Sequence, residues 1–160
     1  MTFRKPDGFD QTYVETVRLA LKNGWRHFDG AEVYKTSTEL GVALSEVAGS
    51  IPRDNLFITT KVHPNIGIAN NDVEGSLMAE LKALKLDYVD LYLIHKAWLP
   101  DGTTIEGVWK QMEDVERKGL TRAIGVSNFG PAEIEKVLSF AEIKPAVNQI
   151  EMHPYLYKEE

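Results

Sequence analysis

Helical and extended segments alternate along almost the whole chain, and this alternation narrows the fold more than any other feature. Apolar residues recur at helical spacing, and each such stretch precedes a short segment rich in β-branched or aromatic residues. The expected helices are 13–23, 38–48, 73–86, 103–118 and 131–140, and the expected strands are 27–29, 56–62, 88–95, 123–127 and 146–152. Such a succession of helix and strand predicts a parallel sheet with right-handed crossovers.

Polar residues at the strand ends favour a barrel over a doubly wound sheet. Each expected strand carries one at or near its C-terminal end: Asp29, Lys61, His95, Ser127 and Gln149. In a barrel these ends converge on one rim, where the loops build active sites. A doubly wound sheet usually has a Gly-rich phosphate-binding loop, which the sequence lacks. We therefore expect an α/β fold, a partial (β/α)8 TIM barrel with about five βα units and parallel strands.

The composition is that of an ordinary globular chain and excludes several kinds of site. Of the 160 residues, 43% are hydrophobic, and 18 Lys and Arg against 24 Asp and Glu give a net charge of −6. This acidic balance argues against nucleic acid or an anionic membrane as partner. Without cysteine there are no disulfides or thiolate sites, and four scattered histidines predict no metal site. The absence of a secretory or membrane-spanning stretch predicts a cytoplasmic location.

Four residues near the expected rim suit proton transfer to a carbonyl group: Asp29, Tyr34, Lys61 and His95. Each alone could be structural, but a carboxylate, a phenol, an ammonium and an imidazole on one rim make a proton-transfer site. Hydride delivery to a carbonyl carbon leaves an alkoxide that must be protonated. We expect the Lys61 ammonium to lower the pKa of Tyr34 from its usual value of about 10, and Asp29 to pair with Lys61. His95 can donate a hydrogen bond to the carbonyl oxygen.

Five separated motifs, which occur in this order, resemble the aldo-keto reductase family. They are residues 24–34, 60–61, 87–95, 112–129 and 147–151. The resemblance implies a catalytic tetrad of Asp29, Tyr34, Lys61 and His95. It also implies that Ser127, Asn128 and Gln149 bind the nicotinamide carboxamide, and that the cofactor is NADPH. NADH is not excluded, because the family's segment that binds the 2′-phosphate has no counterpart in this sequence.

Two departures from the family pattern bear on the substrate. Lys35-Thr36-Ser37 follows Tyr34, where the family usually has Gly-Asn-Glu, and Lys96-Ala97-Trp98 follows His95, where Trp-Pro is common. The first variant resembles a fungal branch of α-keto amide and α-keto ester reductases. We expect Trp98, in the loop after His95, to line the substrate pocket.

The resemblance further implies that residues 1–160 are an incomplete oxidoreductase domain. The strands would be the second to sixth of a barrel, without the first strand and the last two to three βα units, so the open sheet would have two unpaired edges. The predicted function is NADPH-dependent reduction of small aldehydes or ketones, by an enzyme that is a monomer at full length. Two alternatives stay open: an inactive fragment or interaction protein, and a Schiff-base aldolase that uses Lys61.

Overall fold

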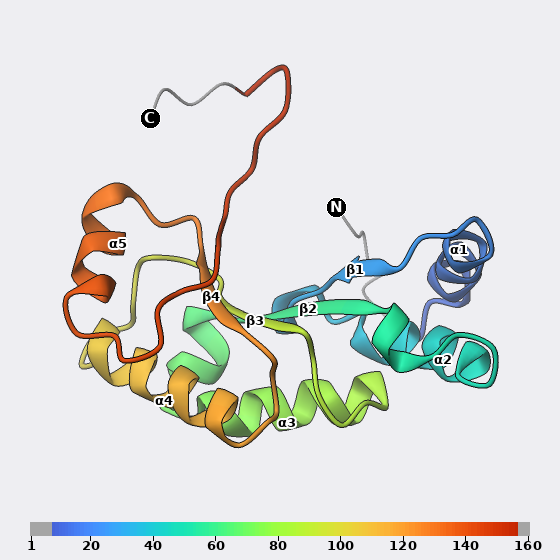
Figure 1. Cartoon of the computed structure of the whole chain (residues 1–160), viewed down its shortest axis with the longest axis horizontal. Helices are drawn as coiled ribbons and strands as arrows, with labels where there is room; N and C mark the ends of the chain where they lie inside the picture. Colours follow the sequence, from blue (N-terminus) through green and yellow to red (C-terminus); the bar gives the residue numbers. More distant parts are fainter. Residues whose placement is uncertain (1–7, 157–160) are drawn as a thin grey trace.

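The computed structural model describes residues 8–156, in which helices and short parallel strands alternate (Figure 1). The helices are α1 (Gln11–Lys22), α2 (Ser37–Val47), α3 (Val73–Leu84), α4 (Ile105–Arg117) and α5 (Pro131–Leu138). The strands are β1 (His27–Asp29), β2 (Phe57–Val62), β3 (Leu91–Ile94), β4 (Ile124–Ser127) and β5 (Asn148–Gln149). Each helix and strand expected from the sequence is therefore confirmed, with shifts at the ends.

The strands form one sheet in the order β1-β2-β3-β4-β5, and every neighbouring pair is parallel. The helices lie along one side of this curved sheet and leave its other side open (Figure 1). The arrangement is part of a parallel barrel, as the strand-end pattern predicts. Because all strands run the same way, their C-terminal ends share one rim.

Local signals in the sequence set the helix ends. Asp10 caps α1 by accepting hydrogen bonds from the backbone N–H groups of the first turn, and Asp72 caps α3 in the same way. The Thr104 hydroxyl caps α4. Gly24 and Gly119 follow α1 and α4 with φ angles of 91° and 75°, in the left-handed region where glycine is favoured.

The main hydrophobic core lies between the helices and the sheet. It includes Ile58 and Tyr92 of the sheet, and Leu77 and Trp109 of the helices, all of them fully buried. The Trp109 indole N–H donates to the Ile143 carbonyl at 3.0 Å, so its one polar atom is satisfied. Trp25, by contrast, is 66% exposed, because it lies in the turn between α1 and β1. No helix within residues 8–156 is long and apolar enough to cross a membrane.

Two strands, β3 and β5, are shorter than the sequence predicts by four residues or more. The extended segment before β3 reaches back to Val89, which forms a β-bridge with Thr121. Between Val89 and β3, the Asp90 carboxylate accepts a hydrogen bond from the Ile58 N–H, and this interrupts the backbone pairing with β2. β5 is limited to Asn148–Gln149. Within residues 8–156 it pairs only with β4, and β1 pairs only with β2, so the sheet has the two open edges expected of a half-barrel.

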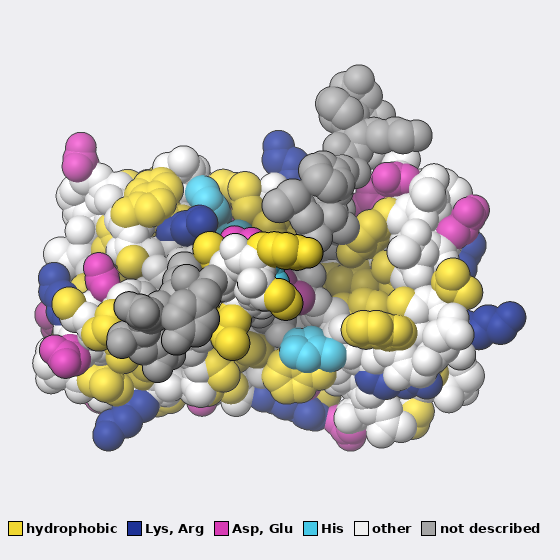
Figure 2. All heavy atoms as spheres, turned by 90° about the horizontal axis from the view of Figure 1, so that it is seen from above, with side chains coloured by type: hydrophobic (Ala, Val, Ile, Leu, Met, Phe, Trp, Pro, Cys, Tyr) yellow, Lys and Arg dark blue, Asp and Glu magenta, His cyan; other side chains and the backbone are white. Residues whose placement is uncertain are grey.

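The side of the sheet that the helices leave open carries apolar groups. From above, hydrophobic side chains gather there with histidines between them (Figure 2). Phe57, at the start of β2, and Val147, just before β5, are 41% and 43% exposed. A complete barrel would bury this face.

Candidate active site

The rim at the C-terminal ends of the strands brings the predicted polar residues together. Asp29 ends β1, Ser127 ends β4 and Gln149 ends β5, while Lys61 lies one residue before the end of β2. His95 follows β3 directly. Tyr34 ends the short 3-10 turn Glu32–Tyr34 that follows β1.

Lys61 is the most deeply buried charged group of the rim. Its side chain is 1% exposed, and its Nζ donates to Asp29 Oδ1 and, at 2.9 Å, to the Gly30 carbonyl. Burial lowers the pKa of Lys61, and the Asp29 carboxylate opposes that change. The expected pairing of Asp29 with Lys61 is thus present. It holds the ammonium in one orientation beneath the rim.

Tyr34 lies between this ion pair and His95. Its hydroxyl is 3.5 Å from His95 Nε2, and the two rings meet edge to face, with centroids 5.5 Å apart. Burial and the Asp29 carboxylate raise the pKa of Tyr34, so the expected lowering is wrong for this structure. The physical reason is the position of Lys61 Nζ, which is 5.3 Å from the ring centroid and already paired with Asp29.

His95 is held in an uncharged state. It is 8% exposed, and burial followed by the positive charge of Lys61 lowers its pKa to about 4. Asn128 Nδ2 donates to the His95 backbone carbonyl at 3.0 Å and fixes the chain there. The ring presents Nε2 to Tyr34, whereas its buried Nδ1 has no hydrogen-bond partner.

Ser127, Asn128 and Gln149 form the neighbouring part of the rim. The Ser127 hydroxyl donates to the Gln149 carbonyl at 2.8 Å, and Asn128 Nδ2 lies 2.9 Å from Ser127 Oγ. Gln149 Nε2 donates to Asp29 Oδ2 at 2.8 Å. This last bond joins β5 to β1, the two edge strands, so the sheet curls enough for one side chain to link its edges. No local pattern in the sequence predicts that contact, because its two residues are 120 positions apart.

Trp98 adjoins the site only through a second histidine. Its side chain is 49% exposed, and its ring lies 6.0 Å from the His63 ring, which in turn lies 5.5 Å from the His95 ring. His63, two residues after Lys61, is therefore next to the rim cluster. In the sequence, the only indication that His63 is near the site was its position two residues after Lys61.

Glu32 is a rim residue that sequence reasoning missed. Its carboxylate accepts hydrogen bonds from the His63 and Gly67 backbone N–H groups and from the Ser76 hydroxyl. It ties the turn that carries Tyr34 to the loop after β2. A carboxylate two residues before Tyr34 was the available signal, but its partners lie more than 30 residues away in sequence.

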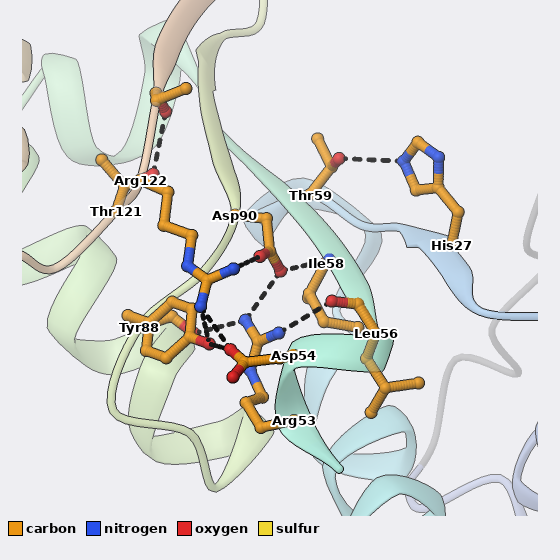
Figure 3. Close-up of polar contacts among 11 residues, drawn as sticks. His27, Arg53, Asp54, Leu56, Ile58, Thr59, Tyr88, Asp90, Thr121 and Arg122 are labelled. Atoms are coloured by element: carbon orange, nitrogen blue, oxygen red, sulfur yellow. Dashed lines mark hydrogen bonds and ion pairs between the residues drawn. The ribbon is translucent and has the colours of Figure 1, made fainter. Parts of the chain in front are cut away.

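The opposite end of the sheet holds a second polar cluster, which consists of Arg53, Asp54, Tyr88, Asp90 and Arg122 (Figure 3). Arg53 donates to Asp90 Oδ2 at 2.7 Å, and both arginines stack on the Tyr88 ring, at 4.1 and 4.5 Å from its centroid. Arg122 also pairs with Asp54 at 2.5 Å. We call these residues the base network.

The rim therefore offers a phenol and a neutral imidazole that face each other beside a buried lysine–carboxylate pair. Such a set can donate two hydrogen bonds to one oxygen atom and pass it a proton. Within residues 8–156, no group of three His, Cys, Asp or Glu residues could hold a metal ion.

Comparison with known proteins identifies the family. Residues 7–160 match the Aldo/keto reductase family, and the chain belongs to it. It is 41% identical to an NADPH-dependent alpha-keto amide reductase of Saccharomyces cerevisiae over 92% of this chain and 48% of that protein. It is also 41% identical to a NAD/NADP-dependent indole-3-acetaldehyde reductase of Schizosaccharomyces pombe, over 98% of this chain and 54% of that protein.

A solved structure shows the same fold. The aldo-keto reductase of Bombyx mori, in complex with NADP, superimposes with a TM-score of 0.84 and 36% identity, over 94% of this chain and 51% of that one. The chain thus spans about half the length of the relatives that it matches. The resemblance stated from five motifs is confirmed.

Proposed function

We propose that this chain carries the proton-donating half of an NADPH-dependent reductase, which converts small aldehydes or ketones to alcohols. The observation that carries the proposal is the pair Tyr34 Oη and His95 Nε2, 3.5 Å apart on the rim and beside the Lys61–Asp29 ion pair. A carbonyl oxygen between the two would accept a hydrogen bond from each.

Tyr34 acts as the general acid. Its raised pKa keeps the phenol protonated at neutral pH, so the proton is present when it is needed. An alkoxide is a much stronger base than a phenolate, so the transfer from Tyr34 is still downhill. The phenolate that remains lies beside the Lys61–Asp29 ion pair, whose ammonium is 5.3 Å from the ring centroid.

His95 supplies the second hydrogen bond. Since its pKa is about 4, the imidazole is neutral at physiological pH and does not compete with Tyr34 as an acid. As charge grows on the substrate oxygen, a neutral donor fixed by packing stabilises it without reorganisation.

The amide and hydroxyl groups of the rim fit a nicotinamide carboxamide. That group has two N–H donors and one carbonyl acceptor, and Ser127, Asn128 and Gln149 offer both kinds of partner. In residues 8–156, Asn128 Oδ1 and Gln149 Oε1 accept no hydrogen bond, so two acceptors are available. Gln149 would exchange its bond with Asp29 for one with the carboxamide. When bound, the reduced nicotinamide supplies hydride. NADPH is the form that the names of the relatives favour, and NADH is not excluded.

We place the described strands as the second to sixth of an eight-stranded barrel, in a domain whose first strand and last two to three βα units lie outside this chain. The two open edges of the sheet and the half-length match to the relatives support this placement. The intact protein would then be a cytoplasmic monomer with a small carbonyl compound as its partner. Lys61 is an unfavourable Schiff-base nucleophile, because it is 1% exposed and ion-paired.

The test is NADPH oxidation by the intact protein with a keto ester and an aldehyde, for the wild type and Tyr34→Phe. Loss of the general acid should lower turnover about 10²–10⁴-fold and leave NADPH affinity, measured by fluorescence titration, nearly unchanged. Tyr155→Phe is the matched control, because that side chain is 97% exposed and outside the rim. Undiminished turnover by Tyr34→Phe would refute the mechanism, and a wild type without turnover would favour the inactive alternative.

A further inference from the structure

A second histidine borders the proposed active site and has no part in the proton transfer described above. The His63 ring lies edge to face with both the His95 and Trp98 rings, at 5.5 and 6.0 Å between centroids. It therefore occupies the space between the residue that would hold the reacting oxygen and the residue expected to line the pocket.

The hydrogen bonding of His63 fixes which nitrogen can donate. Its Nδ1 accepts the Asn65 backbone N–H at 3.2 Å, so in the neutral ring the proton is on Nε2. Burial lowers the pKa of His63, which keeps the ring neutral at physiological pH. Within residues 8–156, no acceptor is hydrogen-bonded to Nε2, so one N–H donor at the edge of the site is free.

The backbone of His63 is anchored to the turn that carries Tyr34. The Glu32 carboxylate accepts the His63 N–H and, from the same loop, the Gly67 N–H at 3.4 Å. Pro64 then opens the π-helical turn Pro64–Ile68. As a result, the imidazole is held at a fixed place relative to the tyrosine, which a binding group requires.

We propose that His63 determines substrate specificity by donating a hydrogen bond from Nε2 to a second carbonyl oxygen, on the carbon next to the one reduced. This inference rests on the proposed function, because the reacting oxygen must lie between Tyr34 and His95. In an α-keto ester or an α-keto amide, the neighbouring carbonyl oxygen is one carbon away, on the side where His63 packs against His95. Trp98 then covers the apolar group beyond it.

The experiment compares two substrates that differ only in the second carbonyl. Ethyl benzoylformate has it, and 2-ethoxyacetophenone has a methylene in its place. In the intact protein, His63→Phe should lower kcat/KM for ethyl benzoylformate about three- to tenfold, the usual contribution of one neutral hydrogen bond. It should leave kcat/KM for 2-ethoxyacetophenone within about twofold. His63→Gln keeps an N–H donor and should recover part of the loss.

An equal loss for both substrates, or no loss for either, would overturn the inference while leaving the reductase in place. A second readout does not depend on turnover: ring resonances of His63 in ¹H–¹⁵N spectra should shift on addition of ethyl benzoylformate and stay unchanged with 2-ethoxyacetophenone. If the wild type reduces neither compound, the proposed function fails. The ring shift alone then decides whether His63 recognises the second carbonyl.

Discussion

The two ends of the sheet carry similar numbers of charged residues but treat them differently. In the base network, Asp90 is 3% exposed and is contacted by Arg53, Arg122 and the Ile58 N–H, so its charge is fully compensated. At the rim, a lysine with 1% exposure has a single carboxylate partner, Asp29, which is itself 38% exposed. The base network therefore resembles a structural clamp. The rim instead keeps a charged lysine away from water with only one carboxylate to balance it.

The difference indicates that the base network serves stability and the rim serves chemistry. Compensated buried charges hold elements together, since removal of one partner leaves the other uncompensated. Titratable groups whose pKa values are shifted by burial cluster at functional sites. At the rim, the pKa of Lys61 and His95 is lowered and that of Tyr34 is raised, in each case chiefly by burial.

The strongest test of the contrast is Asp90→Ala in the base network. The change leaves two arginines and the Ile58 N–H without their buried acceptor, so the free energy of unfolding should fall by about 3–5 kcal/mol. Urea unfolding of the intact protein measures this value. Asp90→Asn is the control, because it keeps hydrogen-bonding atoms, and its cost should be smaller. A loss below about 1 kcal/mol for Asp90→Ala would show that the network is not a clamp.

His95 gives the next largest effect, and it depends on pH. Its pKa is about 4 in the folded protein, against 6.5 as the ordinary value, so the unfolded chain binds more protons between these two pH values. Stability should therefore fall as pH drops through this window. Between about pH 7 and about pH 4.5, the titration of His95 should lower the free energy of unfolding by about 2 kcal/mol. His95→Asn should remove that part of the pH dependence in urea unfolding. An unchanged pH profile would contradict the buried neutral state.

Lys61→Met should change stability by less than about 1 kcal/mol. The apolar side chain avoids the desolvation of the ammonium, and the Asp29 side chain, 38% exposed, can be solvated when its partner is gone. Urea unfolding beside Asp90→Ala makes the comparison direct. A loss as large as the one expected for Asp90→Ala would place Lys61 among the structural charges instead.

The smallest effect is expected at the outer part of the base network. Asp54 is 79% exposed although it pairs with Arg122 at 2.5 Å, so Asp54→Ala should lower stability less than any of the changes above. The ion pair is screened, so added salt should reduce even this difference. A cost near that of Asp90→Ala would mean that the network is cooperative as a whole.

Much of the fold was readable because its signals are local. The cap at Thr104 and the glycine after α4 act within a few residues, and the nearly continuous apolar run of β3 matches a strand that is buried at every position. The end of β5 was overestimated, because pairing depends on a neighbour and the apolar pattern of the strand does not reveal whether one is there.

The sequence by itself determined the order of helices and strands, and it put Asp29, Tyr34, Lys61 and His95 near strand ends that must share a rim, because parallel strands all end on the same side. Only the tertiary structure decided the electrostatic state of those residues. The pKa of Tyr34 is raised, because the ammonium expected to lower it is paired with Asp29 and lies beside the ring. The contacts of Glu32, His63 and Gln149 were likewise decided by packing, since each joins residues that are distant in sequence.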